Sequence, residues 1–567
     1  MGRGSGNGLG AHPWDGLRDP AADRRDLPPG GSAEGRVESR EHGKFFRAAG
    51  AVSLAVSLSR VTGLVREMAM ARLFGAGAVY DAFLLGNRVP NLLRNLFAEG
   101  ALSQAFIPIF TRVLAAKGKE EARELSNAVA TALLLVTGAV SLLGIVFAPQ
   151  VVALLAPGFA QSPGKFQLTV LLIRIMFPFL MLVALAAQAM GVLNSCDVYG
   201  APAVAPAFYN IGSVGVGLAL GYTIGRAFDQ GLIVCMACGV LVGGAMQLAW
   251  QLPGLWRAGF AFRPRLDFRH PQLRELARLM VPAILGSGAM QINALVNTRL
   301  ASTITAGTGH AIDGPVSWLG YAYRFLQFPL GLFGVAVASA TLPAASRAAA
   351  RTADFRAIVS RSLGAILLLT IPSSVGLAVL GESMIGLVYQ GGRFDAYDTR
   401  QTASALTCYS VGLAGLAAIK ILAPAFYALD DALTPMWISV ASIGLNLAVA
   451  LALLRWTSLG HAGLALASSS VALGGAAALF EVLRRRIGGV EGRALGASAL
   501  KILVAAGLMG VACWLASKGV LGHFGSRANS RIAQFTNLAV SVPLGIGLFA
   551  GLARLLRVPE LTLLRRR

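Results

Sequence analysis

Residues 166–192 read FQLTVLLIRIMFPFLMLVALAAQAMGV, and Arg174 is the only charged residue among them. A helix that crosses the hydrocarbon core of a bilayer needs about 20 predominantly apolar residues. This stretch meets that length with a single charge. It therefore predicts a transmembrane α-helix.

The rest of the chain repeats this pattern. Of its 567 residues, 55% are hydrophobic and only 13% are charged, whereas soluble domains carry about 25% charged residues. A soluble core could not hide so much apolar surface, so we expect an all-α integral membrane protein with fourteen spans. They are 46–73, 79–111, 125–148, 166–192, 202–224, 231–255, 275–300, 316–344, 358–380, 402–428, 433–455, 460–482, 496–516 and 532–556.

The positive charges lie mainly in alternate connections between these spans. The net charge is +22, and the arginine-rich connections are 112–124, 256–274, 345–357 and 483–495. Positive loops stay in the cytoplasm and meet anionic lipid headgroups. The pattern predicts that both termini are cytoplasmic, that anionic membrane lipids are partners, and that nucleic acid is not.

A weak internal repeat divides the chain. Residues 191–220 and 425–453 each combine an acidic turn, a proline and an apolar helix with a central asparagine, Asn210 or Asn446. Paired lobes around a site near the bilayer midplane are common in transporters. We expect two six-helix lobes in a pseudo-twofold arrangement, followed by two C-terminal helices. The predicted parts are a disordered cytoplasmic tail (1–43), a first lobe (44–257), a second lobe (258–484) and a C-terminal part with a basic tail (485–567).

Several predicted spans carry charged side chains near their middle. Each such charge costs about 2.5–3.5 kcal/mol on insertion scales, so these residues are expected to face one another or a water-filled cavity. They are Arg60 and Arg66 in the first span, Asp81, Arg88, Arg94 and Glu99 in the second, and Arg324 in the eighth.

Helical geometry places some of these residues on common faces. At 100° per residue, Asn87, Asn91 and Arg94 lie within about 60° of each other, and Arg324 shares a face with Gln327. A guanidinium forms two parallel hydrogen bonds to phosphate oxygens. We therefore expect a diphosphate-binding cavity.

Three alternatives stay open from the residues alone. The arginines could pair with Asp81 and Glu99 only to hold the bundle together, or extend to the membrane surface. A small-molecule antiporter of the same class, or a membrane-embedded enzyme, could also use such a bundle. The CxxC at Cys235 and Cys238 has no second pair for a metal, and no GxxxxGK[ST] motif indicates a nucleotide, so no cofactor is expected.

The second predicted span carries the most specific motif. Residues 90–106 read PNLLRNLFAEGALSQAF, and with VSWLGYAYRFLQFPLGLFGVAVASATLP, YQGGRF and YALDDALTP this strongly resembles the MurJ/MviN lipid II flippases of the MOP exporter superfamily. The resemblance covers about residues 45–560.

The resemblance implies a fourteen-helix transporter, not an enzyme, in the bacterial cytoplasmic (inner) membrane. Its cargo would be lipid II, the undecaprenyl-diphosphate-linked precursor of peptidoglycan, so a role in cell-wall biogenesis and cell shape follows, with cell-wall synthesis proteins as possible partners. The family's cavity arginines fall on Arg60, Arg66, Arg94 and Arg324, its acidic partners on Asp81 and Glu99, and its last two helices form a groove for the lipid tail. The chain departs from some relatives at Asn95, Tyr323 and Gln327, where they carry charged residues.

Overall fold

The computed structural model describes residues 33–95, 102–224, 230–267, 270–305, 312–349, 351–489 and 492–561. The chain divides into two units, Met1–Leu54 and Ala55–Arg567. The first is described only as the start of a helix from Ala33, and all contacts below belong to the second. The predicted tail, residues 1–43, lies outside the described residues as far as position 32.

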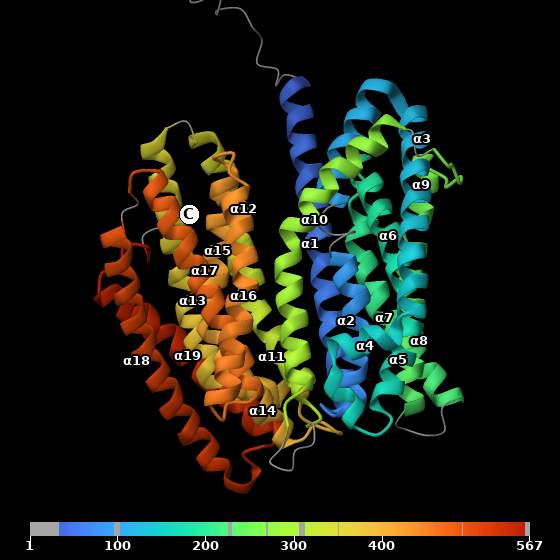
Figure 1. Cartoon of the computed structure of the whole chain (residues 1–567). Coiled ribbons are helices and arrows are strands. Elements are labelled where there is room, and N and C mark those ends of the chain that lie inside the picture. The colour runs from blue at the N-terminus through green and yellow to red at the C-terminus, as the bar shows by residue number, and fades with distance from the viewer. Residues whose placement is uncertain are drawn as a thin grey trace, which may run out of the picture. The chain divides into compact units, whose positions relative to one another are not determined.

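Helices α1 to α9 form the first group (Figure 1). Within it α2 packs on α5, α3 on α6, and α8 on α5, α6 and α7. The helices are α1 (Ala33–Phe74), α2 (Ala78–Arg94), α3 (Ser103–Val146), α4 (Ala148–Leu155), α5 (Lys165–Met176), α6 (Phe179–Ser195), α7 (Gly200–Ile224), α8 (Gln230–Ala249) and α9 (Leu252–Ala258).

Helices α10 to α17 form the second group, and the last two helices pack on its α13. Figure 1 shows α11 to α19 gathered on the side of α10 away from α5 to α8. These helices are α10 (Pro271–Ser302), α11 (Pro315–Pro329), α12 (Val335–Ala348), α13 (Thr352–Tyr389), α14 (Ala396–Val411), α15 (Leu413–Tyr427), α16 (Leu433–Trp456), α17 (His461–Arg486), α18 (Gly492–Phe524) and α19 (Arg531–Leu555).

The prediction of an all-helical membrane protein is confirmed. Among the described residues, ten helices are long and apolar enough to cross a membrane, or eleven when α14 and α15, which meet at 43°, count as one span. The other three predicted spans correspond to α1, α2 and α10. A total of fourteen therefore requires that these arginine-bearing helices cross the membrane as well.

The predicted boundary between the second and third spans is wrong. Helix α2 ends at Arg94, and α3 begins at Ser103 and runs on to Val146 through the predicted loop 112–124, with non-helical dihedrals only at Gly118 (φ 84°). The loop sequence is rich in Ala, Lys, Glu and Arg, which favour helix. Lys117 also pairs with Glu121 at 3.3 Å, one turn further on.

Glycines hold α7 and α8 in close contact. A Cβ added to Gly239 would lie 2.2 Å from the Ser213 carbonyl oxygen, and one added to Gly243 would lie 2.6 Å from the Tyr209 carbonyl oxygen. Small residues four positions apart let membrane helices approach in this way. The contact fixes the position of α7, whose Tyr209 and Asn210 belong to the site described below.

The two repeat asparagines make equivalent contacts. Asn210 on α7 donates to the Ser59 carbonyl of α1 at 3.1 Å, and Asn446 on α16 donates to Asn297 of α10 at 2.9 Å. Each amide thus ties one helix of its group to the helix with which that group begins. This pairing agrees with the internal repeat in the sequence.

Candidate functional site

A cavity of about 740 Å³ lies between the two groups of helices. This volume is in the range of ligand-binding pockets, about 300–1,000 Å³. Its described lining contains four arginines and no carboxylate: Arg66, Arg88, Arg94 and Arg324.

The four arginines come from three helices of both groups. Arg66 belongs to α1, Arg88 and Arg94 to α2, and Arg324 to α11. Arg88 donates to the Thr298 hydroxyl of α10, and Arg94 donates to the neighbouring Asn95 side chain at 3.0 Å. Side chains from separate helices therefore place their positive charge around one space.

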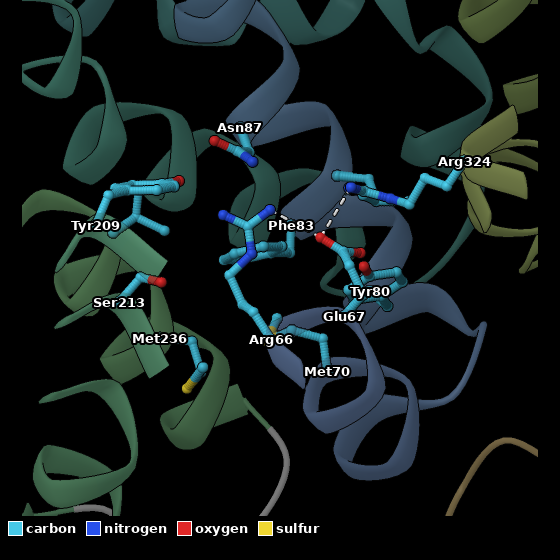
Figure 2. A pocket seen from close by; sticks show the side chains of 12 residues that line it. Arg66, Glu67, Met70, Tyr80, Phe83, Asn87, Tyr209, Ser213, Met236 and Arg324 are labelled. Carbon is cyan, nitrogen blue, oxygen red and sulfur yellow. Dashed lines mark hydrogen bonds and ion pairs between the residues drawn. The ribbon is translucent and has the colours of Figure 1, made fainter. Parts of the chain in front are cut away.

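A buried carboxylate joins two of these arginines. Glu67 Oε1 accepts from Arg66 Nη2 at 2.8 Å and from Arg324 Nη1 at 2.9 Å, and Figure 2 shows both guanidinium groups directed at it. The Glu67 side chain is 7% exposed. One negative charge shared by two positive charges leaves a net charge of +1 in the cluster.

The cluster borders a second, small cavity of about 20 Å³ (Figure 2), which is room for about one water molecule. Tyr209 of α7 closes one side, with its ring centre 5.2 Å from the Arg66 guanidinium carbon. A cation over an aromatic face is held by the ring quadrupole. The packing of α7 therefore orients Arg66.

The predicted amide residues also reach the large cavity. Asn87, Asn91 and Gln327 all line it. The Asn91 amide donates to the Asn87 carbonyl and side-chain oxygens at 2.9 and 2.7 Å. These contacts fix the face of α2 that also carries Arg94.

Three predicted site residues have other positions. Arg60 is exposed and is not part of the described lining of the cavity. Asp81 does not pair with any of the four arginines among its printed contacts, since its carboxylate accepts from Lys165 Nζ at 2.9 Å. Glu99 lies outside the described residues.

Asp81 joins the two groups of helices at one end of the cavity. Besides Lys165 it accepts from the backbone N–H groups of Gly314 at 2.8 Å and Ser317 at 2.9 Å, at the start of α11. Lys165 also binds Asp313 at 2.7 Å. A carboxylate at a helix N-terminus satisfies orphan donors and the helix dipole.

Asp398 of α14 makes the converse contact. Its carboxylate accepts from the Ala76 backbone N–H of the first group at 3.2 Å and from Trp318 Nε1 at 2.9 Å. Arg393 N also donates to the Arg72 carbonyl at 2.9 Å. Each group thus contributes a carboxylate to donors of the other, and we call the contacts of Asp81 and Asp398 the double clasp.

The cavity begins next to the double clasp and extends away from it. On α2 its lining runs from Leu84 to Asn95, just beyond Asp81, and on α11 it includes Leu319 to Gln327, just beyond Ser317 and Trp318. The double clasp therefore closes one end of the space between the groups.

Glu67, Lys165 and Asp398 were not predicted as site residues. A charge inside an apolar run was a signal for Glu67, but it follows Arg66 directly and was passed over. Lys165 and Asp398 stand at predicted span ends, where charge is ordinary. Only the packing of distant helices shows their partners.

Two groups of helices around an arginine-lined cavity closed at one end form the architecture of a membrane transporter. The comparisons agree: a multidrug MATE transporter of the MOP superfamily in an inward-facing conformation matches with a TM-score of 0.57 at 16% identity, over 78% of this chain and 95% of its own. A structure described as lipid II flippase MurJ matches with a TM-score of 0.71 at 23% identity, over 89% of this chain and 98% of its own.

The sequence comparisons give the family. The family described as "Lipid II flippase MurJ" matches residues 70–530. The lipid II flippase MurJ of Burkholderia cenocepacia is 36% identical over 78% of this chain and 84% of its own, and the probable lipid II flippase MurJ of Rhizobium meliloti is 37% identical over 83% and 86%. The chain belongs to the MurJ family of lipid II flippases.

Proposed function

We propose that the chain moves lipid II from the cytoplasmic to the periplasmic leaflet of the bacterial inner membrane by alternating access. The observation that carries the proposal is the cavity lining, which brings four arginines and no described carboxylate to one space between the two groups. The relatives named above are lipid II flippases or probable ones, and lipid II carries a diphosphate.

The diphosphate is held by Arg66, Arg94 and Arg324. Each guanidinium offers a planar pair of donors that matches phosphate oxygens. Arg66 and Arg324 share Glu67, so together they keep one uncompensated positive charge for the cargo. Arg60 lies six residues before Arg66 on α1, about 9 Å along the axis, where it contacts the cargo before the cavity.

The closed end faces the periplasm. The double clasp joins the connections at 75–77, 303–314 and 390–395, which contain few of the positive charges. The arginine-rich connections lie at the other end, so both termini are cytoplasmic by the positive-inside rule. The described state therefore accepts cargo from the cytoplasm, with anionic lipid headgroups around the arginine-rich connections.

Transport requires that the double clasp opens while the cytoplasmic side closes. The lipid tail stays in the membrane, beside α18 and α19. The membrane potential can drive part of the cycle through the charge in the cavity, by about 2.3 kcal/mol per charge per 100 mV.

The test is translocation of labelled lipid II in vesicles that contain the purified chain. Arg94→Ala is expected to reduce translocation strongly and Arg94→Lys partly, because lysine keeps the charge but not the paired donors. Arg174→Ala is the matched control, since Arg174 is exposed and bonds only to the Ile145 carbonyl at 3.3 Å among its printed contacts. Undiminished translocation by Arg94→Ala would contradict the proposed role.

A second candidate is a flippase for another polyprenyl-diphosphate oligosaccharide. The arginine-lined cavity fits that cargo equally well, and competition between the two lipids in the same vesicles separates them. A cation antiporter of the MOP type fits less well, because a cationic cargo calls for carboxylates in the cavity.

A further inference from the structure

The large cavity has a second wall that differs in chemistry from the arginines. Helices α10, α16 and α17 line it with amide and hydroxyl groups, and none of their described lining residues is charged. The polar residues of this neutral wall are Gln291, Asn293, Asn297, Ser439, Ser442, Asn446 and Ser468.

Hydrogen bonds between the three helices order the neutral wall. Asn446 donates to Asn297 Oδ1 at 2.9 Å, and Asn297 donates to Ser468 Oγ at 2.7 Å. Asn293 donates to Ser442 Oγ at 3.1 Å. The side chains are therefore fixed in position before any ligand arrives, which reduces the entropy lost on binding.

Two acceptors of the neutral wall have no hydrogen-bond partner in the described part of the chain. They are Oδ1 of Asn293 and Oδ1 of Asn446, and the Asn446 residue is only 1% exposed. A buried acceptor without a donor costs about 1–3 kcal/mol. The wall is thus short of N–H and O–H donors.

We propose that the neutral wall is a subsite for the uncharged part of the cargo, which supplies hydroxyl and amide N–H donors while the arginines hold its diphosphate. Acetamido sugars and peptides both carry this chemistry. The inference rests on the proposed function and extends it, because the wall selects what is attached to the diphosphate.

The test is binding to the full-length chain in lipid nanodiscs. Three probes are compared: polyprenyl diphosphate alone, the same lipid with an acetamido disaccharide, and the disaccharide lipid with its peptide. Asn293→Ala and Ser439→Ala are the test variants. Ser470→Ala is the control, because Ser470 is exposed on α17 and is not part of the described cavity lining.

Loss of one hydrogen bond corresponds to a five- to tenfold weaker Kd, roughly. We expect this loss in at least one test variant for a probe with a headgroup, and no change for polyprenyl diphosphate alone. A loss already present with the disaccharide assigns the subsite to the sugar, and a loss only with the peptide probe assigns it to the peptide.

Equal weakening for all three probes, or unchanged binding in both test variants, would overturn the subsite. Arg94→Ala separates this result from the proposed function, because it should weaken all three probes. If Arg94→Ala changes none of them while Asn293→Ala weakens the headgroup probes, the arginine proposal fails and the subsite stands.

Discussion

Replacement of Glu67 by glutamine tests the charge arrangement most sharply. Glutamine keeps the size of the side chain and one acceptor oxygen, but it removes the negative charge between Arg66 and Arg324. The two guanidinium groups, which lie 2.8 and 2.9 Å from the same oxygen, then face each other without a counter-ion.

The expected loss in stability follows from the burial of the cluster. Removal of one partner of a buried ion pair costs about 3–5 kcal/mol. The Arg324 side chain is 39% exposed, so solvent reduces the penalty, and we expect about 3 kcal/mol at the lower end of that range. The variant should also bind a diphosphate more tightly, because the ligand restores the missing negative charge.

The assay is thermal unfolding in detergent with and without inorganic pyrophosphate. Glu67→Gln should melt below the wild type without ligand and gain more on addition of pyrophosphate, since stabilisation grows with ligand affinity. Glu481→Gln is the matched control: Glu481 also accepts from two arginines, Arg484 at 2.8 Å and Arg485 at 2.7 Å, but on an exposed surface. Exposed ion pairs contribute only about 0–1 kcal/mol, so its melting should change little.

The reasoning is refuted if Glu67→Gln melts like the wild type without ligand. It is also refuted if pyrophosphate stabilises the variant no more than the wild type. Either result would mean that the carboxylate does not neutralise the two arginines.

Two further predictions concern the clasp and the packing of α7. Asp81→Asn should destabilise the chain by about 3 kcal/mol, because it leaves the buried Lys165 short of charge; the double variant with Lys165→Met should recover part of that loss, and additive losses in a double-mutant cycle would contradict the pairing. Gly239→Ala should reduce the yield of folded protein, since its Cβ would lie 2.2 Å from a carbonyl oxygen, whereas Gly215→Ala meets nothing within 4 Å and should match the wild type by size-exclusion chromatography.

The helices were predictable because each apolar run must satisfy its own backbone in lipid. The same reasoning found Arg66, Arg94 and Arg324, since unexplained charge in such a run needs an inner face. Their joint position in one cavity depends on how α1, α2 and α11 pack, which hydropathy does not encode.

The position of Arg60 could have been anticipated in part. Six residues separate it from Arg66, which places the two side chains about 120° apart on a helix, so both could not face the same cavity directly. The pairing of Asp81 with Lys165 was beyond the sequence, because α5 and α2 meet only in the tertiary fold.

The central claim is that the cargo's diphosphate lies among Arg66, Arg94 and Arg324. A structure of the chain with bound lipid II, determined by cryo-electron microscopy in nanodiscs, measures this directly. We predict phosphate density within hydrogen-bonding distance of all three guanidinium groups. Phosphate density elsewhere, with the three arginines bonded only to protein, would contradict it.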